Sequence, residues 1–389
     1  MVWTVIYTLT NTLKKGNFYL KKAYVSVIND LVTDQRVHKS CVALQKSGYE
    51  VVLIGRKLKH SLPMPSLTYK TVRMRLLFVR GPLFYAEFNI RLFLFLLFKK
   101  VNLFLSNDLD TLLPNFLVSR LRNIPLAYDS HEYYTETPEL VNRKFVQHVW
   151  KLMEQFMLSR IDRMITVNES IAQMFRQEYG IEVVVVRNIP PSIKISTTKS
   201  RSDLGLPVEK KLLILQGSGI NIDRGVEELV LAMQYIDNAV LLLIGNGDAM
   251  PVIRNLIKDN HLEDKVMLFP RMNYSEMMCY TQLADVGFTL DKDTNLNYRF
   301  SLPNKLFDYI HAGIPVLATP LVEIKAIIDR FQIGGFIDSH QPDIMAKQIG
   351  NYLIQNDLMR VWRKNLSFAA ESLNWENEEK ILLKFYSTL

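Results

Sequence analysis

The sequence has 389 residues, of which 48% are hydrophobic and 22% are charged, a globular composition that excludes wholesale disorder. Its length predicts two domains. Cys41 and Cys279 are the only cysteines, so a disulfide framework and a zinc-type spacing are excluded and a reducing compartment is indicated. The net charge of +8 is unevenly spread, because residues 1–100 hold 17 basic and 4 acidic side chains, a balance of +13. This asymmetry predicts that one part of the protein meets an anionic partner.

The N-terminal half alternates between apolar strands and amphipathic helices. Its first ten residues, MVWTVIYTLT, lack the basic start and the small-residue cleavage site of a secretory signal. The strands carry apolar runs without polar alternation, which is typical of parallel strands buried on both faces. We predict strands at 23–30, 49–56, 101–108, 125–132 and 163–170, and helices at 34–47, 83–98, 110–121 and 144–160.

Residues 188–210 break this alternation, because adjacent prolines, a Ser/Thr cluster and charges are typical of a linker. The fold class predicted is α/β, with two Rossmann-like doubly wound parallel-sheet domains that face a central cleft. We expect an N-terminal domain at 1–190, a C-terminal domain at 191–374, and a helix within 375–389 that crosses back to the N-terminal domain. The C-terminal half is predicted to hold strands at 212–218, 240–248, 266–270, 285–290 and 315–319, and helices at 224–235, 250–259, 275–283, 302–312 and 375–387.

The segment NYRFSLPNKLFDYIHAGIPVLATP (297–320) carries the clearest chemistry. Ser301 is predicted to cap the helix that follows it. Four residues fall on one polar stripe of this helix, and a Lys in the first turn suits a phosphate or diphosphate, while a carboxylate four residues on suits ribose hydroxyls. The alternative is a solvated amphipathic helix with an ordinary cap. The stripe consists of Ser301, Asn304, Lys305 and Asp308.

This segment closely resembles the donor-binding segment of GT-B glycosyltransferases, particularly the retaining family 4 enzymes. Their pattern P-x-K-x-x-E-Y-x-x-x-G-x-P-V has Asp308 in place of its Glu here. The family's other Glu, which usually contacts the donor sugar, would fall at Phe300, and this is a departure. The matching positions are Pro303, Lys305, Asp308, Tyr309, Gly313, Pro315 and Val316.

The resemblance extends over nearly the whole chain. In the N-terminal half, residues 106–114 and 127–140 resemble the family's D-x-x-x-L-P and D-x-H-E segments, although NDLVTDQR replaces a glycine-rich loop. The resemblance implies that His131 lies beside the donor sugar and the acceptor. A lone His is otherwise more often structural than catalytic. The acceptor-binding residues implied are Asp34, Arg36, Asp108 and Glu132.

In the C-terminal half, the resemblance implies that Arg224 and Lys305 neutralise a leaving diphosphate without a metal. Ser218 stands where the family has a further loop Arg, and Arg299 is the candidate to replace that cation. The donor-binding residues implied are Gly217, Ser218, Gly219, Gly245, Asn246, Gly247, Arg271, Met272, Tyr274, Arg299, Ser301, Asn304 and Asp308.

Other short patterns point to other functions. The D-x-D spellings at 108–110 and 291–293 are typical of metal sites in a different transferase fold, and we expect no metal and no cofactor here. Segment 83–98 is interpreted either as a core helix or as a helix in a membrane interface, and the adjacent cations favour contact with an anionic membrane. No nucleic-acid-binding signature is present.

The sequence therefore predicts a retaining, metal-independent glycosyltransferase that moves a sugar from a nucleotide-diphosphate sugar to a glycan or lipid-linked acceptor, in polysaccharide or glycolipid synthesis. We expect it in the cytoplasm, peripherally at the inner face of the cell membrane. Two alternatives stay open: a GT-B nucleotide-sugar epimerase, and a non-catalytic scaffold, which Phe300 motivates.

Overall fold

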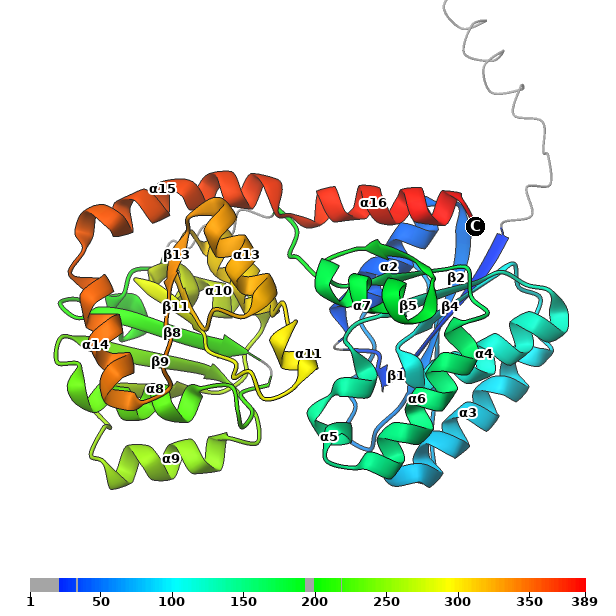
Figure 1. Ribbon diagram of the computed structural model, residues 1–389, viewed down its shortest axis with the longest axis horizontal. Coiled ribbons are helices and arrows are strands. Elements are labelled where there is room, and N and C mark those ends of the chain that lie inside the picture. The colour runs from blue at the N-terminus through cyan, green and yellow to red at the C-terminus, as the bar shows by residue number, and fades with distance from the viewer. Residues whose placement is uncertain (1–20, 33, 193–198, 218) are drawn as a thin grey trace, which may run out of the picture. The chain divides into compact units, whose positions relative to one another are not determined.

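The computed structural model describes residues 21–32, 34–192, 199–217 and 219–389. Its residues group into two compact units, one formed by the described residues up to Asp129 together with Leu383–Leu389, and the other by Ser130–Leu382. The described residues hold two parallel sheets, of seven and six strands (Figure 1). The predicted α/β class with two parallel sheets is therefore confirmed. The predicted domain bounds near residue 190 stay a prediction.

The first sheet has the strand order β3-β2-β1-β4-β5-β6-β7. Its central strands are buried along their length, as in residues 23–28 of the first strand, because helices cover both faces of a parallel sheet. The order in which successive strands are added to the sheet reverses between β1 and β4. This switch point is where ligands bind in open α/β sheets. The strands are β1 (Lys21–Asp30), β2 (Tyr49–Arg56), β3 (Lys70–Met74), β4 (Leu103–Asn107), β5 (Leu126–Ser130), β6 (Arg163–Thr166) and β7 (Glu182–Val185).

The helices that alternate with these strands bury an apolar stripe each. In α3 (Gly81–Leu97) the buried residues Phe84, Phe88, Leu92 and Leu96 recur every four positions and pack in one cluster with side chains of β1, β2 and β4. The segment therefore packs as a core helix, while its other side stays exposed. The remaining helices are α2 (Gln35–Lys46), α4 (Leu109–Arg122), η1 (Tyr134–Glu136), α5 (Pro138–Val141), α6 (Lys144–Leu158) and α7 (Glu169–Tyr179).

The second sheet has the order β10-β9-β8-β11-β12-β13, so its topological switch point lies between β8 and β11. Alternate residues of β8 belong to different core clusters: Leu213 and Leu215 pack in one, and Leu212 and Ile214 in the other. Both faces of this sheet are therefore covered. The strands are β8 (Lys211–Gly217), β9 (Ala239–Gly245), β10 (Val266–Phe269), β11 (Val286–Thr289), β12 (Val316–Ala318) and β13 (Gly334–Phe336).

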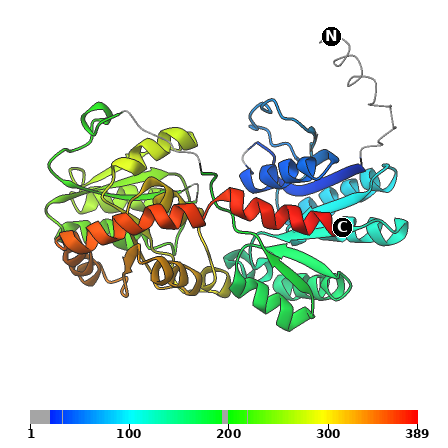
Figure 2. The same cartoon turned by 90° about the horizontal axis from the view of Figure 1, so that it is seen from above.

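Different helices cover the two faces of this second sheet (Figure 1). Residues of α8, α9 and α14 join one core cluster and those of α12 and α13 join the other, while α15 contributes residues to both. The helix α15 packs against α12, α13 and α14, as seen from above in Figure 2. The helices are η2 (Ser202–Leu204), α8 (Val226–Ala232), η3 (Met233–Tyr235), α9 (Met250–Asp259), α10 (Tyr274–Leu283), α11 (Leu296–Arg299), α12 (Asn304–Ala312), α13 (Val322–Phe331), α14 (Pro342–Leu353), α15 (Asn356–Ser372) and α16 (Trp375–Ser387).

The alternation predicted from sequence missed several elements at the sheet edges and near the C-terminus. β3 contains KTVRM, whose residues are exposed or half-buried, so it lacks the apolar run of a central strand. β7 and β13 are short, with four and three residues, and β13 begins with two glycines. The helices α7 and α13–α15 were also missed. None of the described helices is both long enough and apolar enough to cross a membrane.

Candidate functional site

Two loops at the carboxyl ends of β8 and β9 are in backbone contact. A Cβ on Gly245 would lie 1.9 Å from the Gly217 carbonyl oxygen, and one on Gly247 would lie 2.0 Å from that of Ile220. Gly245 also has a φ of 145°, which side-chain-bearing residues rarely adopt. The Ile220 amide donates to the Asn246 carbonyl at 2.9 Å. Glycine is therefore required for these loops to contact each other. The predicted donor residue Ser218 lies outside the described residues.

Lys305 lies in the first turn of α12 and is only 7% exposed. Its ammonium nitrogen is 3.9 Å from the position of a Cβ on Gly217, so it lies beside the β8 loop. Burial lowers the pKa of this lysine, an effect that the nearby Asp291 opposes. Because Asp308 on the same helix is 8% exposed, the alternative of a solvated amphipathic helix is wrong.

Asp308 is held by hydrogen bonds on both of its carboxylate oxygens. Tyr274 donates its hydroxyl to Oδ1 at 3.0 Å, and Gln216 donates its amide to Oδ2 at 3.2 Å. Gln216 is in turn fixed by the Thr281 hydroxyl, which donates to its Oε1 at 2.5 Å. Burial and then the Asp308 charge raise the pKa of Tyr274, so its hydroxyl keeps its proton. The carboxylate therefore has a fixed orientation.

Arg224 precedes α8 and pairs with Asp291, which follows β11 and is fully buried. Its Nη1 lies 3.3 Å from Asp291 Oδ2, and its guanidinium lies over the Tyr298 ring, 5.0 Å from the centroid. Burial opposes the charged form of Arg224, but Asp291 and Tyr298 outweigh burial and its pKa is raised. Arg224 therefore stays charged at the switch point of the sheet.

The D-x-D spelling at 291–293 has a cation beside each carboxylate. Asp291 pairs with Arg224, and Asp293 pairs with Arg299 at 2.9 Å. The Arg299 and Asp293 side chains are both about half exposed, and the pair joins two residues of the same segment between β11 and α12. Between them, Lys292 pairs with Glu228 at 2.6 Å. No cluster of His, Cys, Asp or Glu suited to a metal was found among the described residues.

The loop that follows β5 carries His131, which is half-buried. Asn297 of α11 contacts the next two residues: it donates its amide to Glu132 Oε2 at 3.1 Å, and its Oδ1 accepts from the Tyr133 backbone amide at 3.1 Å. Phe300, next to α11, accepts on its carbonyl a bond from the Asn168 side chain at 2.7 Å. The residues flanking His131 and Phe300 are thus fixed by side-chain amides.

Ser301 does not cap α12, which corrects the prediction. The helix begins later, at Asn304, its N-cap position is Pro303, and no side chain caps it. The Ser301 hydroxyl is buried and finds no hydrogen-bond partner among the described residues. The separate short helix α11 displaces the serine from the cap position. No side chain therefore occupies the first-turn amides of α12, although the Leu306 amide donates to the Pro303 carbonyl at 3.1 Å.

The predicted acceptor residues of the first unit lie at the switch point of the first sheet, after β1 and β4. Asp34 caps α2 by accepting from the Val37 amide at 3.1 Å. Arg36 forms a buried pair with Asp129 at 2.6 Å. Asp108 has a φ of 59°, and its amide donates to the Asp129 carbonyl. Their role in acceptor binding stays a prediction.

Two further predicted donor residues, Arg271 and Met272, lie in the loop between β10 and α10. Arg271 is exposed, and Met272 packs partly against the core that contains α12. This loop leads directly to Tyr274 and so to Asp308. The structure therefore brings together Lys305, Asp308, Tyr274 and the glycines of the β8 and β9 loops. Arg224 pairs with Asp291, whose charge also acts on Lys305.

Two family descriptions match almost end to end along the chain. Residues 35–196 match Glycosyltransferase Family 4, and residues 196–367 match Glycosyl transferases group 1. The chain belongs to glycosyltransferase family 4. Among curated proteins, this family 4 chain is 20% identical over 258 residues to a D-inositol 3-phosphate glycosyltransferase of Xylanimonas cellulosilytica. It is 22% identical over 261 residues to a protein of the same description from Corynebacterium jeikeium.

These alignments cover 60% and 61% of this chain but only 58% and 60% of the two relatives, so the chain spans less than two thirds of their length. Among solved structures, sucrose-phosphate synthase from Thermosynechococcus elongatus matches with a TM-score of 0.79 at 17% identity, over 95% of this chain and 98% of that one. Anabaena HepE in complex with UDP-glucose matches with a TM-score of 0.73 at 12% identity, over 95% and 100%. This likeness confirms the predicted GT-B fold.

Four residues that contact the candidate site residues are not predicted by local sequence patterns. Asp291 is predicted only as part of a D-x-D pattern, although a charged residue directly after a buried strand signals a strand-end site. Gln216 is the one amide in an otherwise apolar strand end, which is a usable signal. Tyr298 and Asn297 carried no local signal, because their partners are far away in the sequence.

Proposed function

We propose that this chain is a glycosyltransferase that moves a sugar from a nucleotide-diphosphate sugar to an acceptor. The observation that carries the proposal is Lys305, a buried ammonium in the first turn of a helix whose N-terminus has no side-chain cap. A buried cation attracts an anion more strongly than an exposed one because water screens it less. The diphosphate of a sugar nucleotide supplies that anion next to the glycine loops.

Arg224 supplies a second fixed positive charge. It is oriented by Asp291 and Tyr298 before any ligand arrives. Charges that are already in place stabilise the negative charge that develops on a leaving diphosphate without reorganisation. In this proposal Lys305 and Arg224 together do the work that a metal does in other transferases.

Asp308 is the group proposed to hold the ribose. Tyr274 and Gln216 each donate a hydrogen bond to one of its oxygens and so orient the carboxylate. In this proposal the carboxylate accepts hydrogen bonds from neighbouring ribose hydroxyls. Asp is one methylene shorter than the family's usual Glu. The hydrogen bonds from Tyr274 and Gln216 therefore set where the shorter carboxylate lies.

The transfer step is proposed to proceed with retention, as in the family that the chain belongs to. The acceptor approaches the donor sugar on the face of the leaving group, and a leaving phosphate oxygen takes its proton. His131 is proposed to help place the transferred sugar. Phe300 carries no hydrogen-bonding side chain, so the sugar contacts that the family's Glu would make are assigned to other groups.

The acceptor is proposed to be a glycan or a lipid-linked molecule at an anionic membrane surface. The exposed side of α3 presents Leu83, Ile90, Leu94 and Phe98, which are 52–79% exposed and fall on one face of the helix. Exposed cations flank this face and the loop before it, namely Arg75, Arg80, Arg91 and Lys100. Apolar groups with adjacent cations are typical of surfaces that bind anionic lipid.

The test of the donor site is thermal unfolding in the presence of nucleotides and a chelator. We expect UDP, CDP, GDP or ADP, or one of their sugars, to raise Tm, because a ligand that binds only the folded state stabilises it. The HepE complex makes UDP-glucose the first sugar to try. If every nucleotide diphosphate leaves Tm unchanged, the donor site is absent and the scaffold alternative holds. Conversion of the bound sugar nucleotide without acceptor would favour the epimerase alternative.

A further inference from the structure

A buried carboxyl group lies behind the loop that carries His131. Glu154 of α6 is 1% exposed. Its Oε2 lies 2.9 Å from the Tyr179 hydroxyl oxygen and accepts a hydrogen bond from the Thr135 hydroxyl at 3.3 Å. Its Oε1 is buried and finds no partner within the part of the chain that the structure describes. The carboxyl group thus connects α6 to α7 and to η1.

The hydrogen bonds of this cluster require one proton more than its hydroxyl groups supply. Tyr179 Oη lies 2.9 Å from Glu154 Oε2 and also 2.9 Å from Glu178 Oε1, yet a phenol donates only one hydrogen bond. One of these carboxyl groups must therefore be protonated for both contacts to be hydrogen bonds. Because Glu178 is exposed and Glu154 is buried, the proton belongs on Glu154. A neutral carboxyl also tolerates the unpaired Oε1 better than a carboxylate does.

The same cluster fixes the loop of residues 131–137. The Tyr133 hydroxyl donates to Glu178 Oε2 at 3.0 Å, and the Tyr133 ring packs edge-on against Phe175. Thr135 is fully buried, and its carbonyl accepts from Gln147 Nε2 of α6 at 2.9 Å. Every side-chain bond from Thr135 and Tyr133 therefore ends on α6 or α7. These contacts hold the loop two to four residues after His131.

We propose that Glu154 is a positioning residue, which in its protonated form holds the loop of residues 131–137 in the arrangement needed for sugar transfer and on ionisation releases it. The inference rests on the proposed function in assigning His131 to the transfer step. Ionised Glu154 would place a second negative charge across Tyr179 from Glu178, and the repulsion would separate α6 from α7. The loop of residues 131–137 is bonded to both helices, through Thr135 to α6 and through Tyr133 to α7, so their separation would displace it.

The surroundings of Glu154 place its ionisation near neutral pH. Burial raises the pKa of its carboxyl to about 7, and the Glu178 charge also raises it. The groups that act in the opposite direction come from all three elements around it: Tyr179 of α7, Thr135 of η1 and Lys151 of α6 itself. Lys151 is mainly engaged by Glu136, at 2.5 Å.

The ring of Trp150 provides a reporter in the native chain. It packs edge-on against Tyr134 of the loop, with centroids 5.3 Å apart. The fluorescence of Trp150, obtained by subtracting the spectrum of a Trp150→Phe variant, is expected to change with a midpoint near pH 7, the pKa of Glu154. No substrate is needed for this measurement.

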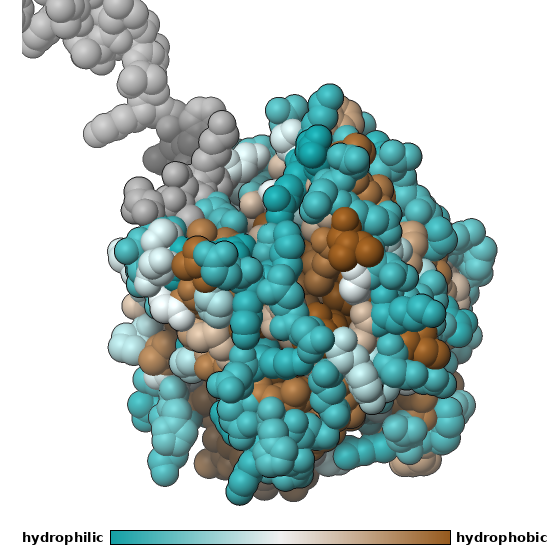
Figure 3. All heavy atoms as spheres, turned by 90° about the vertical axis from the view of Figure 1, so that its left-hand side faces the viewer, coloured by the Kyte–Doolittle hydropathy of each residue, from teal (hydrophilic) through white to brown (hydrophobic). Residues whose placement is uncertain are grey.

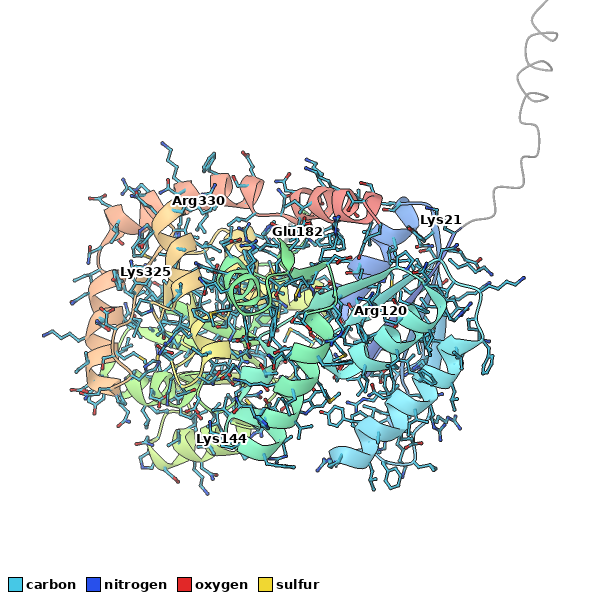
Figure 4. The ribbon with its side chains drawn as sticks, turned by 45° about the vertical axis from the view of Figure 1, so that its right-hand side comes forward. Lys21, Arg120, Lys144, Glu182, Lys325 and Arg330 are labelled. Carbon is cyan, nitrogen blue, oxygen red and sulfur yellow. The ribbon has the colours of Figure 1, made fainter. Side chains whose placement is uncertain are left out.

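Three variants decide the matter. Glu154→Gln keeps the shape and hydrogen-bonding atoms but cannot ionise, so the fluorescence transition is expected to vanish. Glu178→Gln removes a charge that raises the pKa of Glu154, so the midpoint is expected to move to lower pH. The control Glu182→Gln, at a residue labelled in Figure 4 whose side chain is 60% exposed, is expected to leave the transition in place.

Kinetics with the donor that raises Tm complete the test. In the native protein kcat is expected to fall roughly tenfold as pH rises through about 7, with little change in KM, because a displaced loop misplaces a reacting group. Glu154→Gln is expected to keep its kcat at high pH. A fluorescence transition that persists in Glu154→Gln, or a kcat fall that persists there, overturns the proposal. Absence of turnover at every pH instead contradicts the proposed function. The pH transition of Trp150 fluorescence still tests the proposed role of Glu154 in that case, because it needs no substrate.

Discussion

Two groups of cations in this protein differ in how they are built. Lys305 and Arg224 lie at the switch point of the second sheet, where Lys305 is 7% exposed and Arg224 pairs with a fully buried carboxylate. The cations around α3, such as Arg80 and Lys100, are exposed and lie next to exposed apolar side chains. Arg224 is held in position by its neighbours and Lys305 is buried, whereas the second group is solvated.

This difference teaches what each group can recognise. Fixed, poorly solvated charges bind one anion of matching shape and are little affected by salt. Solvated charges contribute small, similar amounts to binding any anionic surface, and salt screens them within about 10 Å. The excess of positive charge in residues 1–100 therefore gives no information on the proposed donor site, whose residues lie elsewhere in the chain.

The largest effect is expected at Lys305. Lys305→Ala should lower kcat by roughly 100-fold or more and abolish the rise of Tm with nucleotide diphosphate, because a preorganised charge at the diphosphate is lost. The measurement is donor turnover together with thermal unfolding. Lys325→Ala is the matched control: this lysine lies on α13 with its side chain 50% exposed and is labelled in Figure 4. Near-normal turnover in Lys305→Ala would contradict the proposed role.

An intermediate effect is expected on the exposed face of α3. Replacing Ile90 and Leu94 with Glu should lower binding to vesicles that contain anionic lipid by roughly tenfold, since apolar contact is lost and like charges are introduced. Binding of the native protein should also weaken as salt rises. Donor turnover in solution should not change.

Ile354→Glu is the control for this surface. Ile354 is 76% exposed and follows α14. On the face of the molecule that Figure 3 shows, hydrophilic side chains predominate and apolar ones form separate groups. Co-sedimentation that ignores both salt and anionic lipid would remove the membrane proposal. A change of oligomeric state in the α3 variant would instead assign this face to a second copy of the chain.

The smallest effect is expected at Tyr274. Tyr274→Phe removes one hydrogen bond to Asp308, worth about 1 kcal/mol, so the donor KM should rise about fivefold while kcat changes little. Steady-state kinetics at varied donor concentration measure this. An unchanged KM would show that the orientation of Asp308 depends on Gln216 alone.

Much of the fold could be predicted from local patterns, because buried parallel strands are apolar throughout and their helices bury one stripe. The prediction failed at β3, β7 and β13, where edge strands need little apolar surface. It also failed at Ser301, because the start of α12 depends on the preceding α11, which is stabilised by contacts of Asn297 with Glu132 and Tyr133.

For the candidate site, the sequence by itself determined which residue types stand at the strand ends and first helical turns, and so the α/β class, Lys305 and Asp308. Only the tertiary structure decided that Asp291 faces Arg224, that Tyr274 and Gln216 hold Asp308, and that Glu154 lies behind the His131 loop. The physical reason is that periodicity and capping act over a few residues, whereas these contacts join residues 19 to 92 positions apart.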